Sequence, residues 1–105
     1  MPVSVGMVLQ PIHDLEAVVV DDLGQCHRAS VLGIPRDDGL WDGYIEFRCE
    51  EGGVHVTPRE TTQPDAGGLF SWASRLSEVY LEGALARATD RASGLLGFRR
   101  PAAVT

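Results

Sequence analysis

Five consecutive side chains that can all form hydrogen bonds stand between a predicted strand and a predicted helix. They are Arg59, Glu60, Thr61, Thr62 and Gln63. An arginine can bind a carboxylate or a phosphate through two parallel hydrogen bonds, and a glutamate can accept a proton. The hydroxyls and the amide can orient a ligand, so this polar run is the first candidate site. The alternative interpretation is a solvated edge strand, whose charges keep the sheet from pairing with other chains.

A second candidate is the polar face of a hairpin predicted for residues 41–57. Alternating polarity places four chemically useful side chains there: Glu46, Arg48, His55 and Arg59. A two-residue loop at Glu51-Gly52 sets Arg48 opposite His55 and leaves Glu46 diagonal to His55. If this face lined a cleft, Glu46 and His55 could share acid–base chemistry. An odd-length loop would reverse which residues share a face. The alternative interpretation is an exposed sheet with weak cross-strand ion pairs.

The spacing of the cysteines, histidines and serines matches no known metal-binding or nucleophile motif. The residues whose types suit zinc are Cys26, His27, Cys49, His55 and His13. They lack the CxxC and HExxH spacings, and adjacent strand residues such as Cys26 and His27 point to opposite faces. Cys49 falls on the apolar side of its strand with no activating histidine expected there, and Ser71 lacks the GxSxG motif. We therefore expect two free thiols, no bound metal and no cofactor.

The charge of the chain excludes several classes of function. All nine basic residues are arginines, and the net charge is −6. Without lysine there is no P-loop lysine and no Schiff-base lysine. A nucleic-acid or anionic-membrane partner is not expected, because such binding needs clustered positive charge. We find no signal peptide and no apolar run of membrane-spanning length, so we expect a cytoplasmic protein. The absence of lysine and asparagine indicates a GC-rich, most simply bacterial, coding sequence.

The order of predicted elements indicates an α+β domain. Strands are expected over residues 16–21, 26–34, 41–49 and 54–57, and residues 3–9 form a further strand or an arm. Pro11 and His13-Asp14 are expected to separate residues 3–9 from the strand at residues 16–21. The predicted fold is an antiparallel β-meander of four to five strands followed by two C-terminal helices packed on one face. A partly closed barrel is the alternative. Residues 1–96 form a single domain in this prediction, and residues 97–105 form a flexible tail.

The two helices are predicted from their apolar stripes. Asp65 is a suitable N-cap for a helix over residues 66–76, and Ser77 caps a second helix that ends around residues 89–93, with Gly94 as its stop. Phe70 and Tyr80 fall off these stripes. A homodimer through the helical layer would cover both side chains, whereas a monomer whose loops cover them is the alternative.

Three segments resemble a small bacterial family of uncharacterised proteins of unknown function. They are Trp41–Phe47, Arg59–Pro64 and Val79–Leu85. The resemblance covers about residues 41–88 and implies no activity, cofactor or catalytic residue. It draws attention to a possible cluster where the strands meet the second helix, made of Glu46, Arg59, Glu60, Thr61, Tyr80 and Glu82.

Two functional hypotheses follow. The first is a small non-catalytic binding or regulatory module, possibly a homodimer, for a protein or small-molecule partner. Its candidate ligand-binding residues are Glu46, Arg59, Glu60, Thr61, Thr62, Gln63, Tyr80 and Glu82. The second is a small enzyme that uses Glu46 or Glu60 as a carboxylate base and Arg59 as an anion clamp. The positions of these side chains in the fold discriminate between the two.

Overall fold

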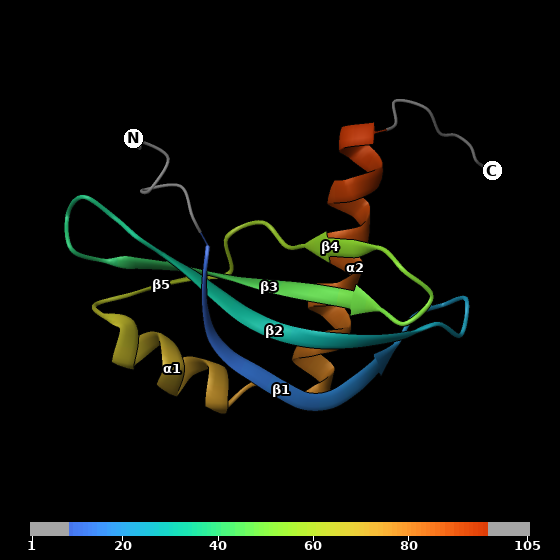
Figure 1. Cartoon of the computed structure of the whole chain (residues 1–105), viewed down its shortest axis with the longest axis horizontal. Coiled ribbons are helices and arrows are strands. Elements are labelled where there is room, and N and C mark those ends of the chain that lie inside the picture. Colours follow the sequence, from blue (N-terminus) through green and yellow to red (C-terminus); the bar gives the residue numbers. More distant parts are fainter. Residues whose placement is uncertain (1–8, 97–105) are drawn as a thin grey trace.

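The computed structural model describes residues 9–96 and has the α+β architecture that the sequence predicts. An antiparallel sheet of five strands is followed by two helices (Figure 1). The sheet is open, so the barrel alternative is wrong. The expected strand at residues 3–9 and the expected tail at residues 97–105 lie almost wholly outside the described residues.

The sheet has the strand order β1-β2-β3-β4, and β5 also pairs with β3. The strands are β1 (Gln10–Val20), β2 (Cys26–Pro35), β3 (Trp41–Cys49), β4 (Val54–Val56) and β5 (Thr61–Gln63). The two short strands divide one edge of β3 between them. They are separated around Pro58, which has no amide proton to donate to a ladder. The preceding Thr57 still pairs with Ile45, because its amide donates to the Ile45 carbonyl at 3.0 Å and its Oγ1 accepts from the Ile45 amide at 3.0 Å.

β1 is longer than the sequence predicts. Pro11, His13 and Asp14 were expected to interrupt the chain, but all three lie within the strand. The pairing of β1 with β2 instead shifts register between Pro11 and His13, and again between Asp14 and Val18. Irregularities of this kind let a strand continue past residues that fit a regular ladder poorly.

The register of β3 with β4 differs from the predicted one by one residue. Phe47 lies opposite His55 and Arg48 lies opposite Val54. The loop closes with a hydrogen bond from the Cys49 amide to the Gly53 carbonyl at 3.0 Å, so three residues separate these two partners. An odd-length loop reverses the parity, and His55 therefore shares a face with Phe47 rather than with Arg48. The predicted pairing of Arg48 with His55 is wrong.

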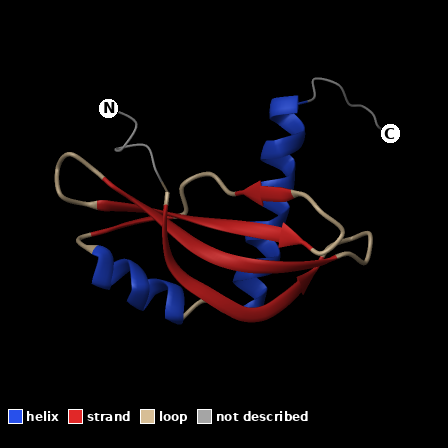
Figure 2. Ribbon diagram, in the orientation of Figure 1, coloured by secondary structure: helices blue, strands red, loops and turns tan. Residues whose placement is uncertain are grey.

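Both helices pack on the same face of the sheet, the covered face (Figure 2). α1 (Ala66–Ser74) is capped by Asp65, whose side chain accepts from the Gly68 amide at 2.7 Å. α2 (Glu78–Leu96) begins after Ser77, whose Oγ accepts from the Tyr80 amide at 3.1 Å. The two N-caps are as predicted. α2 continues through Gly94 to Leu96, beyond its predicted end, and neither helix is long and apolar enough to cross a membrane within residues 9–96.

The core forms between the helices and the odd-numbered residues of β2 and β3. Its members include Ala29, Val31, Ile45, Phe47, Leu69, Ala73, Leu81, Ala84, Leu85 and Ala88. Gly33 and Gly43 are direct cross-strand partners, and Leu69 of α1 lies against both. A Cβ at these glycines would come within 2.7 and 2.5 Å of the Leu69 methyl groups. The two glycines therefore allow α1 to pack close to the sheet. On the opposite, open face, Val18, Val20 and Val54 remain exposed.

Candidate functional site

Within the polar run of residues 59–63, Glu60 forms hydrogen bonds to side chains of α2. Its carboxylate accepts a hydrogen bond from the Tyr80 hydroxyl at 2.6 Å. The Arg87 guanidinium donates to the same carboxylate from Nη2 at 2.7 Å and from Nε at 3.0 Å. Only 5% of the Glu60 side chain is exposed. The three residues, which we call the Glu60 cluster, join the segment before β5 to the second helix.

The Glu60 cluster fixes its own protonation states. Burial alone would raise the pKa of Glu60, but the hydrogen bonds from Arg87 and Tyr80 outweigh it and lower that pKa. Burial and the neighbouring carboxylate raise the pKa of Tyr80 to about 12. The Arg87 guanidinium also lies 5.4 Å from the centre of the Tyr80 ring, which packs edge-on against Trp72. A carboxylate held ionised by several donors is a structural brace rather than a poised base.

The remaining predicted site residues do not gather around Glu60. Arg59 and Thr62 approach Asp42, with an Arg59 Nη1 to Oδ2 distance of 3.9 Å and a Thr62 Oγ1 to Oδ1 distance of 2.7 Å. The Gln63 amide donates to Thr61 Oγ1 at 2.8 Å. Glu46 accepts from Arg48, and Glu82 lines a separate hollow beside β1. Sequence reasoning brought Glu60 and Tyr80 together and missed Arg87, whose only signal was its place on the polar side of the second helix.

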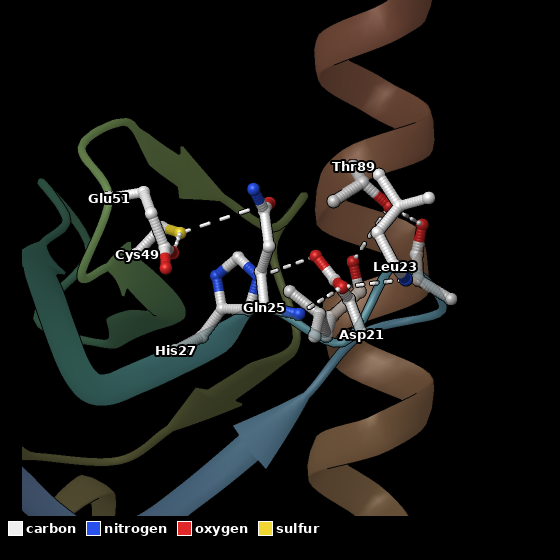
Figure 3. Close-up of polar contacts among 9 residues, drawn as sticks. Asp21, Leu23, Gln25, His27, Cys49, Glu51 and Thr89 are labelled. Carbon is white, nitrogen blue, oxygen red and sulfur yellow. Dashed lines mark hydrogen bonds and ion pairs between the residues drawn. The ribbon is translucent and has the colours of Figure 1, made fainter.

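A pair of histidines, His27 buried and His55 partly buried, lies on the covered face near the β1–β2 turn. Only 2% of His27 is exposed, and its Nε2 lies 2.9 Å from Asp21 Oδ2 (Figure 3). The hydrogen bond from His27, together with backbone donors, lowers the pKa of Asp21. Because the ionised carboxylate only accepts, Nε2 carries the proton and Nδ1 faces the interior. The His55 ring lies 6.4 Å away, and neither Nδ1 has a hydrogen-bonding partner among the described residues.

Cys49 lies opposite His27 on the same covered face. This corrects the expectation that no histidine shares its face, and the signal was the alternation of His27, Ala29 and Val31 on β2. The thiol lies 3.2 Å from Glu51 Oε1. The backbone at Glu51 lowers the pKa of Cys49, but the Glu51 carboxylate and burial outweigh this and raise it, so the thiol is not activated. Both cysteines are free, and no group of three metal-ligating side chains occurs in the described part of the chain.

A hollow of about 250 Å³ lies on the open face, over the middle of β1, β2 and β3. Its lining residues are Asp14, Leu15, Arg28, Ala29, Ser30 and Arg48. The Ser30 hydroxyl donates to Asp14 at 2.8 Å, and Arg48 Nη2 lies 2.7 Å from Glu46 Oε1. Glu46 and Arg48 were predicted to share this face, and they do. Arg28 was not predicted as a site residue, although alternation along β2 places it beside Arg48.

Arg28 and Arg48 are direct cross-strand partners. Like charges directly opposite each other destabilise a sheet. Among residues whose side chains are described, the Arg28 guanidinium has no ion pair, in contrast to Arg87. Two guanidinium groups, one of them unpaired, therefore line the same hollow.

The chain matches no protein-family model, no curated protein and no solved structure. The resemblance to the bacterial family stays a prediction, and the functional argument depends on the geometry alone.

Proposed function

We propose that the protein is a non-catalytic binding or regulatory module that takes an anionic ligand in the hollow lined by Arg28 and Arg48. The observation that carries the proposal is the direct cross-strand pairing of these two arginines. A carboxylate or phosphate placed between them would offset their repulsion and accept hydrogen bonds from both. Ser30, on the same hollow, already donates its hydroxyl proton to Asp14, so the two guanidinium groups supply the donors for the anion.

The charge balance of the chain supports this assignment. The chain has net charge −6, so its nine arginines are outnumbered by carboxylates, and two arginines facing each other are unexpected. Arg36, Arg48, Arg59 and Arg87 each have a carboxylate within 4 Å. Among the described arginines Arg28 and Arg75 have none, and of these two Arg28 lies directly across from another arginine. A cross-strand arrangement that lowers stability is typical of residues retained for binding.

The enzyme hypothesis has less support. Its base would be Glu46 or Glu60, with Arg59 as the anion clamp. Glu60 already accepts three hydrogen bonds and has a lowered pKa, whereas a general base works best with a pKa near the ambient pH. Glu46 is bound to Arg48, and Arg59 lies near Asp42, so clamp and base do not converge.

The test is a thermal-shift screen with inorganic phosphate, small dicarboxylates and phosphorylated metabolites at low ionic strength. A ligand at about 100 times its dissociation constant should add about 2.7 kcal/mol to native stability. We expect the shift to be lost in Arg28→Gln and retained in Arg75→Gln, the matched control at the exposed C-cap of α1. A shift retained in Arg28→Gln and lost in Arg59→Ala would instead move the site to the polar run.

We also infer a cytoplasmic bacterial protein that binds no nucleic acid and forms a homodimer through the helical layer. Phe70 supports the dimer, because it is exposed on α1 apart from an edge-on contact with His13 at 5.0 Å. Tyr80 no longer supports it, because its hydroxyl and ring are engaged within the chain. Sedimentation of the native chain and of Phe70→Ser tests the dimer, and a native monomer would contradict it.

A further inference from the structure

The second half of β1 is an unprotected edge of the sheet. In the strand order β1 is outermost, and within residues 9–96 no strand pairs with its outer side. Its first half carries the usual protection against pairing with other chains: Pro11, the charges of Asp14 and Glu16, and two register shifts. Val18–Val20 has none of these and pairs regularly with β2. The side chains of Val18 and Val20 are 45% and 55% exposed on the open face.

The backbone groups of this edge point outward at alternate residues. The Asp21 amide donates to the Gln25 carbonyl at 3.0 Å, so the backbone of Asp21 faces β2. Hydrogen-bonding direction alternates along an antiparallel strand. Val19 therefore also faces β2, and the amide and carbonyl groups of Val18 and Val20 face away from it. An added strand could bond to these groups.

Two hollows run along this edge, between β1 and the first turns of α2. The smaller, about 130 Å³, is lined by Val18–Val20, Glu78 and Glu82. The larger, about 250 Å³, includes Val20 and Glu82 and continues past Asp21 and Asp22. They share Val20 and Glu82 and so lie next to each other, and we call the two hollows together the edge groove.

The charges of the edge groove are all of one sign. Asp22, Glu78 and Glu82 have no ion-pair partner among the described residues, and no arginine lines either hollow. The Asp21 carboxylate is already engaged by His27 and by the amides of Leu23 and Gln25. A second copy of the chain pairing through the same edge would bring these carboxylates together and is disfavoured. A basic segment would complement them.

We propose that the edge of β1 at Val18–Val20 binds an extended peptide of alternating basic and apolar residues as an additional strand. The main chain of the peptide pairs with Val18 and Val20, as in other cases of β-strand addition. Its alternate side chains point to opposite faces. The basic ones meet Glu78 and Glu82, and the apolar ones lie beside the exposed valines of the open face. This site is separate from the arginine-lined hollow and does not depend on the proposed function.

The experiment titrates the native chain with an acetylated, amidated peptide of about six residues, the usual strand length, in which arginine and valine alternate. Amide chemical shifts and hydrogen exchange are followed by NMR. We expect shifts at residues 18–22 and 78–82, with slower exchange at Val18 and Val20. Affinity should fall about fivefold in the double variant Glu78→Gln/Glu82→Gln, the loss expected for two exposed ion pairs. The matched control Glu16→Gln, on the protected half of β1, should bind as the native chain does.

Two further peptides separate strand addition from simple charge attraction. A peptide with N-methyl groups on the amides that would face β1 should not bind, because it cannot complete the ladder. A peptide with glutamate in place of arginine should not bind either. Equal binding of the N-methylated peptide would overturn the proposal. So would shifts confined to other parts of the chain, unchanged affinity in the Glu78→Gln/Glu82→Gln variant, or no binding of the arginine–valine peptide at low ionic strength.

Discussion

The arginine of the Glu60 cluster and the arginines of the Arg28–Arg48 pair have opposite surroundings. Arg87 donates two hydrogen bonds to a buried carboxylate and lies over the Tyr80 ring. Arg28 faces a second arginine across the sheet and has no ion pair among the described side chains. Charges matched within the chain stabilise the fold, whereas charges left unmatched at a hollow favour a ligand. The comparison separates residues that hold the structure from residues free to bind.

The largest effect should come from removing the centre of the Glu60 cluster. Glu60→Ala leaves the Tyr80 hydroxyl and the Arg87 guanidinium without their acceptor. We expect a loss of about 2 kcal/mol in the free energy of unfolding, since hydrogen bonds to a charged group contribute about 1.5–3 kcal/mol and Arg87 can return to water. Urea denaturation measures it. A loss as small as that caused by Glu16→Ala, at an exposed glutamate, would show that the Glu60 cluster does not stabilise the fold.

The next effect is the acid dependence of stability. Because the pKa of Glu60 is lowered in the folded state, its contribution is present above its ordinary value of 4.5 and is lost as pH falls through the folded pKa. Glu60→Gln should therefore have a flatter stability curve in acid than the native chain. Parallel curves for the two proteins below pH 4.5 would show that Glu60 is not held ionised by its neighbours.

The stability of the protein at alkaline pH tests the same cluster through Tyr80. Its pKa is raised from 10.0 to about 12, so the folded state favours the protonated hydroxyl. That contribution is present below pH 10 and is lost as pH rises through about 12. Tyr80→Phe should lose less stability over this window than the native chain, as measured by denaturation at increasing pH. An identical loss in both proteins would contradict the assignment.

The smallest effect has the opposite sign. Arg28→Thr removes one of the two facing charges and adds a residue that favours strands. We expect the free energy of unfolding to rise by about 0.5 kcal/mol at low salt and by less at high salt, where the repulsion between the arginines is screened. The matched variant Arg75→Thr, at the C-cap of α1, should gain nothing. A destabilised Arg28→Thr would show that Arg28 supports the fold as Arg87 does.

The parts of the fold that follow from local periodicity were predictable. The turn at residues 22–25 predicted β2, alternation predicted β3 and the apolar stripes predicted both helices. Asp65 and Ser77 cap the helices as expected. The pairing of β3 with β4 was not predictable, because it depends on whether the glycine-rich loop holds an even or an odd number of residues. Gly52 and Gly53 adopt positive φ angles here, but glycine accepts positive and negative φ alike, so the sequence leaves both loop lengths open.

The candidate sites were only partly predictable, and for the same reason. Glu60 and Arg87 are 27 residues apart and meet because α2 crosses the sheet, which no local pattern specifies. His55 was assigned to the polar face, and the one-residue change in register places it beside His27 on the covered face. Arg28 lies on a strand that was predicted, yet its importance depends on the residue directly across from it. Long-range register therefore decides which polar residues meet.

A double-mutant cycle on Arg28 and Arg48 tests the central claim most directly. The unfolding free energies of the native chain, Arg28→Thr, Arg48→Thr and the double variant isolate the interaction between the two arginines from the ion pair of Arg48 with Glu46. We predict a repulsive coupling of about 0.5 kcal/mol at low salt, which disappears when a bound anion saturates the hollow. A zero or attractive coupling without ligand would contradict the account, because the pair would then leave nothing for an anion to neutralise.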